Sequence, residues 1–483
     1  MGDSPNNISS LFGFFWVALG AGFLALLTPC VYPLIPMTVS FFTKQKGGKK
    51  LALFYGICII LIYVVFGTII ARFFGASFNN WLSTHWLPNV LFFAIFLLFG
   101  ISFLGAFEIV LPSSLVNKID AKSDKGGLSG VFFMAFTLVL VSFSCTGPVA
   151  GSILIASANG QLLKPIVGMF GFSLAFAIPF TLFAIFPNWL NSLPKSGGWM
   201  NSVKVVLGFL EIALALKFLS TADQVYHWHI LDREVYLALW IVIFSFIGLY
   251  LIGKIKTSHD SNIEKLSVPR ILMGIIAFAF VIYMIPGMFG APLKALAGWL
   301  PPMSSQDFVL GNGLSKSENN DDSNFPSKVK YQDLLELPHG INGFFDYKEA
   351  VDYAKSVNKP VFIDFTGHGC VNCRKMEENV WVKPSILSKL KNDFVVVALY
   401  ADEKHELPKN EWYKSKDDGL EKTTIGDQNL DFQITKFNAN AQPLYCIINP
   451  NDDSKPLVEP KSFDLSEDNF LQFLNDGLKK FKE

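Results

Sequence analysis

The sequence is poor in cysteine and has no excess of either charge. Six cysteines in 483 residues are too few for a disulfide-stapled scaffold, and their spacing lacks the paired clusters of a zinc domain. Lysine and arginine together number 40, as do aspartate and glutamate, so the charge balance argues against nucleic acid as a partner. No flavin, haem or nucleotide motif is visible, so we expect no cofactor. The first apolar run has no basic segment before it, which is unlike a signal peptide.

Long apolar runs are what the sequence has in abundance. Eight of them can each span about 30 Å of hydrocarbon. They cover roughly residues 11–43, 51–71, 90–111, 130–156, 165–186, 203–220, 235–253 and 271–289. We therefore predict a polytopic α-helical membrane domain over residues 1–290, embedded in a lipid bilayer.

Basic residues are distributed unevenly between the loops that join these runs. The loops 44–50, 113–129, 187–204 and 254–270 hold 13 lysines and arginines, whereas the three loops between them hold only Arg72, Lys164 and Arg233. Loops rich in basic residues stay in the cytoplasm. Both ends of the membrane domain, and the segment that follows it, are then expected on the outer side.

Two cysteines lie inside apolar runs, each three residues before a proline. Cys30 precedes Pro33, and Cys145 precedes Pro148. Each falls in the first helix of a candidate three-helix repeat, and an odd number of spans inverts the second copy, a plan that many transporters share. The pattern favours a redox pair in a shielded cavity over inert buried thiols. Cys58 has no proline nearby and is expected to be inert.

Other polar groups in the membrane domain give weaker signals. Glu211 is either functional or paired within the membrane. Lys217 is expected to snorkel from a helix end. His227, Trp228 and His229 are a candidate metal site, but two histidines do not complete a zinc site, so an interfacial loop with an aromatic anchor is favoured.

The remainder of the chain is polar and mixed. Residues 291–335 are predicted to be a flexible linker, because the Ser/Asn/Asp-rich part cannot bury enough apolar surface. Residues 336–483 have an α/β pattern. The predicted helices are 346–357 (with Asp346 as N-cap), one from Cys370, one from Pro384, 429–437 and 466–481, and the predicted strands are 361–365, 394–399 and 444–448, with a polar insertion at 401–427.

The pair Cys370 and Cys373 has the spacing of a redox-active dithiol. A thiol at a helix N-terminus is favoured as thiolate, so Cys370 is the predicted nucleophile and Cys373, one turn later, the resolving thiol. Asp364 lies on a strand that is expected to be buried, and it can shuttle the proton of Cys373. Glu377 either assists in this transfer or lies on the solvated face of its helix. A metal clip is the less favoured alternative for the two thiols. Cys446 is predicted to be inert core.

With these motifs in place, the sequence resembles the DsbD family of thiol:disulfide interchange proteins over nearly its whole length. The membrane motifs around Cys30 and Cys145 are similar to those that the family shares with CcdA-type proteins, and residues 336–483 resemble its C-terminal thioredoxin-like domain. The resemblance implies that Asp364 is the buried thioredoxin aspartate, that Glu377 is the second acidic residue, and that Pro443 is a cis-proline facing the disulfide.

The sequence also departs from that family. Gly369 stands where thioredoxins usually have tryptophan, and 401–427 is longer than a plain thioredoxin needs. The family's N-terminal immunoglobulin-like domain is expected to be supplied separately or to have been removed.

The resemblance further implies a function and a location. Two electrons would pass from cytoplasmic thioredoxin through Cys30 and Cys145 to Cys370 and Cys373. The acceptors would be a periplasmic immunoglobulin-like domain, disulfide isomerases and cytochrome c maturation thiols, and the location would be the bacterial inner membrane. The alternatives are a quinone-coupled thiol oxidase and a soft-metal transporter that uses the same cysteines.

Overall fold

The computed structural model describes residues 11–26, 48–73, 83–107, 130–136, 138–139, 163–185, 197–257, 266–306 and 325–483. They divide into two compact units. The first comprises Met1–Ser83, Leu91–Ala215 and Phe246–Gly274, and the second comprises Thr84–Val90, Leu216–Ser245 and Ile275–Glu483. Cys30 and Cys145, with the prolines that follow them, lie outside the described residues.

Four helices in the described part of the chain are long and apolar enough to cross a membrane. They are α5 (Trp86–Phe103), α10 (Gly197–Tyr226), α11 (Arg233–Leu251), and α12 (Val268–Met284) with its 3₁₀ extension η2 (Ile285–Phe289). Many of their large apolar side chains are exposed, among them Leu98, Val242 and Ile276. An outward apolar surface of this kind suits contact with lipid.

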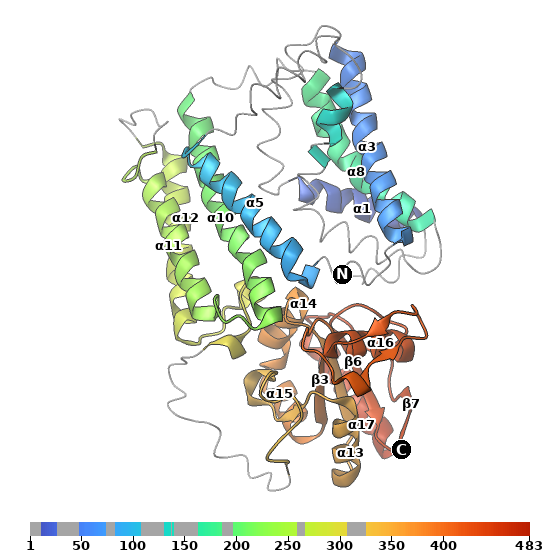
Figure 1. The fold of residues 1–483 in the computed structure, drawn as a ribbon. Helices are drawn as coiled ribbons and strands as arrows, with labels where there is room; N and C mark the ends of the chain where they lie inside the picture. The colour runs from blue at the N-terminus through green and yellow to red at the C-terminus, as the bar shows by residue number, and fades with distance from the viewer. Residues whose placement is uncertain are drawn as a thin grey trace. The chain divides into compact units, whose positions relative to one another are not determined.

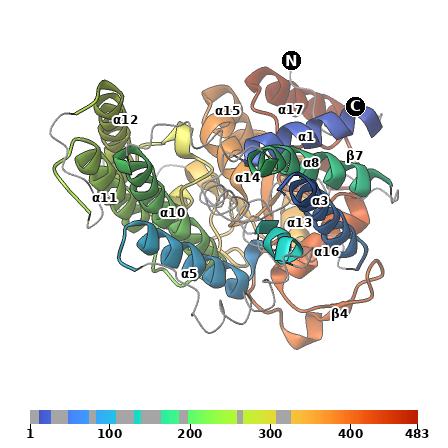
Figure 2. The same cartoon turned by 90° about the horizontal axis from the view of Figure 1, so that it is seen from above.

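In the first unit, α1 (Leu11–Ala25) and α3 (Gly48–Phe73) both pack against α8 (Leu163–Ile185) (Figure 1; Figure 2). Tyr63 on α3 makes ring contacts with Phe172 and Phe176 on α8, at centroid distances of 5.7 Å in both cases. Cys58 is buried in this cluster as a free thiol. Glu211, on α10, is buried, and its Oε2 has no hydrogen-bond partner among the described residues.

The second unit contains an α/β domain built on a five-stranded sheet of order β1-β3-β2-β6-β7. The strands are β1 (Gly343–Phe344), β2 (Val361–Thr366), β3 (Val395–Tyr400), β6 (Leu444–Asn449) and β7 (Asp452–Pro456). β1, β3 and β2 run parallel, whereas β6 is antiparallel to β2 and β7 is antiparallel to β6. The apolar β2 is the central strand, between β3 and β6, which are labelled in Figure 1.

Helices cover both faces of this sheet. They are α13 (Tyr347–Val357), α14 (Val371–Met376), the π-helical segment η6 (Glu377–Trp381), α15 (Pro384–Asn392), α16 (Ile425–Phe437) and α17 (Glu467–Lys482). Successive strand residues point to opposite faces. Phe362 contacts Trp381 of η6, whereas Phe365 contacts Phe432 of α16 on the other face. Asp364 shares the face of Phe362 and therefore points to the side that carries η6.

Local signals explain where these helices begin. Asp346 accepts a hydrogen bond from the Glu349 amide at 3.1 Å, as the predicted N-cap should. Pro384 opens α15, where a missing amide is tolerated. α16 begins at Ile425, four residues before the predicted start at 429, because Thr424 caps it by accepting from the Asp427 amide at 3.1 Å.

The short and polar elements differ most from expectation. The polar insertion holds the 3₁₀ helix η7 (Lys409–Glu411) and a two-stranded sheet of β4 (Tyr413–Lys414) and β5 (Glu421–Lys422). The residues of β1 and β7 show no alternation or apolar run that would predict a strand. Lys217 does not end its helix, since α10 continues to Tyr226.

Part of the predicted linker is folded. After α12 the chain forms the 3₁₀ helices η3 (Lys294–Leu296) and η4 (Met303–Ser305), and a third, η5 (Pro338–Gly340), precedes β1. Leu293 and Leu300 are buried, and the Gln306 side-chain amide donates to the Gly287 carbonyl at 3.2 Å. These contacts hold residues 291–306 within the second unit.

Candidate functional site

Cys370 and Cys373 form a disulfide at the N-terminus of α14, with Cα atoms 5.3 Å apart. The Cys373 amide donates to Cys370 Sγ at 3.1 Å, so the sulfur occupies the position of a helix N-cap. Cys370 is half-buried, whereas Cys373 is buried. This order of exposure is what a nucleophile followed by a resolving thiol requires.

Asp364 is a buried carboxyl on β2, close enough to Glu377 and Arg374 to feel their charges. Its Oδ1 has no hydrogen-bond partner among the described residues. Burial raises the pKa of Asp364 well above the ordinary value, the negative charge of Glu377 raises it further, and Arg374 opposes both in part. Burial therefore favours the protonated form of this carboxyl.

Glu377 is also buried, so the interpretation of this residue as a solvated helix face is wrong. Its Oε1 lies 2.8 Å from Arg374 Nη2, and the same nitrogen donates to Thr366 Oγ1 at 3.3 Å. Burial raises the pKa of Glu377 to about 7, even though Arg374 lowers it. Two buried carboxyls with raised pKa values thus lie close to the disulfide helix.

The Gln442–Pro443 peptide bond is cis, as predicted. It leads directly into β6, where Leu444 pairs with Phe365 of β2. Cys446 lies within β6 opposite Ile363 and is fully buried, and burial raises the pKa of its thiol. Its place in the core agrees with the prediction.

Asp402 holds the loop that leads to Cys370, a role that the sequence did not reveal. Its two carboxylate oxygens accept from the amides of His368 and Gly369, at 2.9 Å each. The strand order alone points to this contact, because Asp402 follows the end of β3 and the loop follows the end of β2, its parallel neighbour. Carboxyl ends of neighbouring parallel strands meet at one edge of a sheet, where ligand and active-site residues gather.

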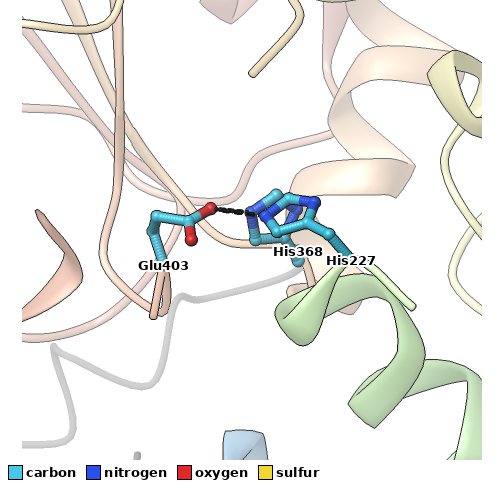
Figure 3. Close-up of side chains that lie close together, drawn as sticks. All are labelled: His227, His368 and Glu403. Carbon is cyan, nitrogen blue, oxygen red and sulfur yellow. Dashed lines mark hydrogen bonds and ion pairs between the residues drawn. The ribbon is translucent and has the colours of Figure 1, made fainter. Parts of the chain in front are cut away.

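The next residue, Glu403, brings two histidines together (Figure 3). Its Oε2 lies 3.0 Å from His227 Nε2 and 2.9 Å from His368 Nε2. Burial alone would raise the pKa of Glu403, but the hydrogen bonds and charges of the two histidines outweigh it, so the pKa lies below its usual range. The interpretation of residues 227–229 as an interfacial loop therefore misses the contact between His227 and Glu403. Trp228 is exposed, as that interpretation expects of an aromatic anchor.

The disulfide loop lies against two other segments of the second unit. A Cβ on Gly369 would lie 3.2 Å from Thr221 Cγ2 of α10, and one on Gly298 would lie 2.5 Å from Val371 Cγ1. A side chain at position 369 would therefore have to displace Thr221 by a few tenths of an ångström, a contact that glycine avoids. Next to this contact, Arg233 Nη1 lies 3.2 Å from Glu378 Oε1.

The disulfide is at a helix N-terminus, β2 of the same domain carries a buried carboxyl, and β6 follows a cis-proline. This combination suits thiol–disulfide exchange. The α/β fold around it is thioredoxin-like, and the same chain carries a helical membrane domain. The class defined is thus a membrane protein with a thioredoxin-like redox domain.

Comparison with known proteins shows which families the two parts of the chain match. Residues 11–222 match the family described as cytochrome C biogenesis protein transmembrane domain, and residues 343–450 match a thioredoxin-like family. The chain is 29% identical over 401 residues to the thiol:disulfide interchange protein DsbD of Vibrio vulnificus, covering 80% of this chain and 58% of that protein. It is 28% identical over 410 residues to DsbD of Campylobacter jejuni, covering 81% and 63%.

A third relative, DsbD of Haemophilus influenzae, is 33% identical over 221 residues, covering 44% of this chain and 37% of its own length. The chain is a homologue of the DsbD thiol:disulfide interchange proteins, as the sequence motifs predict. It spans about three fifths of the length of the Vibrio vulnificus and Campylobacter jejuni relatives.

Proposed function

We propose that this protein is a membrane protein-disulfide reductase that carries two electrons outward across a membrane. The observation that carries the proposal is the Cys370–Cys373 disulfide, which caps α14 in a thioredoxin-like domain fused to membrane helices. The names of its relatives, thiol:disulfide interchange proteins, support the same reaction class.

The exchange at the terminal pair follows from its geometry. An incoming thiolate attacks one sulfur of the disulfide, and a second donor thiolate resolves the mixed disulfide, which leaves Cys370 and Cys373 as a dithiol. In the next transfer Cys370 acts as the nucleophile on an acceptor disulfide, because it is the more exposed sulfur and the Cys373 amide stabilises its thiolate. Cys373 then attacks the mixed disulfide and releases the reduced acceptor.

Proton movement accompanies these steps. Cys373 must lose a proton when it resolves the mixed disulfide and gain one when the pair is reduced. Asp364 lies on the sheet face that carries η6, and its raised pKa makes it a proton carrier for the buried thiol. Glu377 assists as a second acidic group, and Pro443 borders the site at the start of β6.

In the membrane domain, we propose eight spans, with helices 1–3 and 4–6 as inverted repeats followed by two more. Cys30 and Cys145 then occupy equivalent positions and form the membrane redox pair. Reduced cytoplasmic thioredoxin opens the Cys30–Cys145 disulfide, and the resulting dithiol reduces Cys370–Cys373. Each transfer moves two electrons, and its direction depends on reduction potentials, with about 30 mV equal to 1.4 kcal/mol.

We place the thioredoxin-like domain on the periplasmic side of a bacterial inner membrane. The uneven distribution of basic residues between the loops supports this orientation. A contact within the second unit supports it too: Arg233 belongs to a loop expected outside, and it pairs with Glu378 of the thioredoxin-like domain. As acceptors we propose a periplasmic immunoglobulin-like domain, disulfide isomerases and cytochrome c maturation thiols.

The test traps cysteine states in proteoliposomes that contain the intact protein, with reduced thioredoxin only on the cytoplasmic side. Alkylation followed by mass spectrometry then reports each cysteine. We expect Cys370 and Cys373 to become reduced, and we expect Cys30→Ser or Cys145→Ser to abolish this. Cys58→Ser is the matched control within the membrane domain and should leave the reduction unchanged, because Cys58 is buried in the helix cluster.

Two results would contradict the proposal. Reduction that survives both Cys30→Ser and Cys145→Ser would remove the membrane pair from the path. Oxidation of the membrane cysteines by added quinone, without thioredoxin, would instead favour a thiol oxidase that runs electrons inward.

A further inference from the structure

Glu403 joins two histidines from distant parts of the chain, at a place that thiol exchange does not require. His227 follows α10, and His368 precedes Cys370 by two residues. His227 and Glu403 are 176 residues apart in sequence, yet both histidine Nε2 atoms contact the same carboxylate oxygen. The three side chains converge from separate elements (Figure 3), and their ligand-type atoms all lie within 4.8 Å of one another.

We propose that His227, His368 and Glu403 bind a divalent first-row transition-metal ion, with zinc as the preferred ion. Two imidazole nitrogens and one carboxylate oxygen are the ligand set of zinc sites that keep a fourth position for water. Imidazole suits zinc, copper and nickel, whereas magnesium and calcium prefer oxygen ligands. The site is separate from the redox thiols and uses none of them.

The spacing of the three atoms fits such an ion after a small adjustment. Tetrahedral zinc with bonds of about 2.1 Å places neighbouring ligand atoms about 3.4 Å apart. The two nitrogen–oxygen separations are 3.0 and 2.9 Å, as expected when hydrogen bonds occupy the same positions. On metal binding each nitrogen–oxygen separation would therefore lengthen by about half an ångström, and two hydrogen bonds would be exchanged for three metal bonds.

The surroundings hold the ligands in place. The exposed fractions of the side chains are 1% for Glu403, 9% for His368 and 24% for His227, so the site is sheltered but open on the His227 side. Glu403 Oε1 accepts from the His405 amide at 2.8 Å, which leaves Oε2 for the metal. The His368 ring packs on Tyr400 at a centroid distance of 4.5 Å. Hydrogen bonds and packing of this kind orient metal ligands and increase affinity.

A bound ion would have a local consequence. It would tie the end of α10 to the loop that carries Cys370, because His227 and His368 belong to these two segments. The loop is already fixed on its other side by Asp402. Zinc would thus restrict the position of the disulfide relative to α10 without taking part in electron transfer.

Cobalt serves as the spectroscopic probe of the site. The full-length protein is placed in lipid nanodiscs with Cys370–Cys373 oxidised, and Co²⁺ is titrated while visible and near-ultraviolet absorption are recorded. We expect one equivalent to bind with ligand-field bands but no thiolate-to-cobalt charge-transfer band, and Zn²⁺ to displace it. A thiolate band would place the ion on cysteines and overturn the proposal, as would the absence of saturable binding.

Variants assign the ligands. His227→Ala and His368→Ala should each weaken Co²⁺ binding by about tenfold or more, since loss of even an outer partner costs about 10- to 100-fold. His229→Ala is the matched control: it lies two residues away, is 70% exposed and faces Asp232. Its affinity should stay within about twofold of the wild type. Equal effects of all three substitutions would overturn the assignment.

A measurement on the unaltered protein covers the case in which a variant fails to fold. With Cu²⁺ as the probe at one equivalent, pulsed electron paramagnetic resonance should detect two coordinated imidazoles. Detection of one imidazole or none would overturn the site. Neither experiment requires electron transfer, so failure of the proposed reductase activity would leave both results interpretable.

Discussion

Arg233 Nη1 and Glu378 Oε1 form an ion pair at 3.2 Å in which the exposed fractions of the side chains are only 0% and 5%. Arg233 opens α11, Glu378 belongs to η6, and Arg233 Nη1 also donates to the Pro301 carbonyl at 2.7 Å. The pair thus joins the beginning of a membrane helix, the segment after α12 and the π-helical segment that follows the disulfide helix. Buried pairs of this kind are sensitive to the loss of one partner.

Arg233→Met should therefore destabilise the second unit by about 3–5 kcal/mol, because it leaves the Glu378 carboxylate buried and unpaired. Arg233→Met with Glu378→Leu should recover most of that loss, since no charge is then buried alone. Thermal unfolding of the detergent-solubilised protein measures both.

The control for this pair is an exposed ion pair. Lys383 Nζ lies 3.1 Å from Glu467 Oε2, and both side chains are 40% exposed. Lys383→Met should cost less than about 1 kcal/mol. A double variant of the buried pair that is no more stable than Arg233→Met alone would show that the charges are not what couples these segments.

The pKa of Asp364 predicts a pH dependence of stability. Burial raises this pKa first, and Glu377 adds to the shift. When a carboxyl has a higher pKa in the native state than in the unfolded chain, its contribution to stability is largest below the unfolded pKa, which is about 3.9 for aspartate. That contribution is lost as the pH rises through the native pKa. The contribution of this carboxyl to stability should therefore decline as the pH rises above about 4. Glu377, with a pKa raised to about 7, acts in the same direction.

Asp364→Asn should reduce this loss, because the buried carboxylate no longer has to ionise. At pH 8 we expect the variant to be more stable than the wild type by about 1–3 kcal/mol, with little difference at pH 4. Thermal unfolding of the oxidised protein from pH 4 to pH 9 tests this. The exposed Asp352→Asn is the control, and parallel profiles for Asp364→Asn and the wild type would contradict the prediction.

Asp402 is predicted to be a positioning residue for the disulfide loop. Asp402→Ala removes both acceptors of the His368 and Gly369 amides, and hydrogen bonds to a charged group contribute about 1.5–3 kcal/mol each. Hydrogen exchange at these two amides should accelerate by about tenfold or more. Asp418→Ala, which removes the acceptor of the Leu420 amide in the polar insertion, should leave them unchanged. Equal protection in Asp402→Ala and the wild type would refute the role.

The close contact between Gly298 and Val371 can be tested with a double-mutant cycle. A Cβ on residue 298 would lie 2.5 Å from Val371 Cγ1, which is closer than atoms in proteins pack. Gly298→Ala should therefore open the contact at the start of α14 and cost about 1–3 kcal/mol. Val371→Ala removes the obstructing methyl groups, so the double variant should recover part of the loss. An additive double variant would mean that the two residues do not meet.

Short-range patterns in the sequence were enough for much of the fold and for the redox motif. The apolar run that becomes β2, the cap at Asp346 and the proline at the start of α15 all act within a few residues, and the structure follows them. The cysteine spacing places both thiols on one turn of helix, and the disulfide forms there. β1 and β7 escaped prediction because strands so short depend on their neighbours in the sheet for their existence.

The burial and the hydrogen-bond partners of several site residues depend on contacts between distant parts of the chain, and only the tertiary structure decided them. From the sequence, Glu377 fitted equally well as an acidic group of the redox site and as a residue on a solvated helix face. Packing within the second unit buries it beside Arg374. Asp402 and Glu403 looked like the beginning of a polar insertion, yet they hold the loop before Cys370. The sequence by itself determined the chemistry of the thiols and the class of each domain. The partners of those thiols were decided by the fold, because hydrogen bonds and burial depend on which chain segments meet in space.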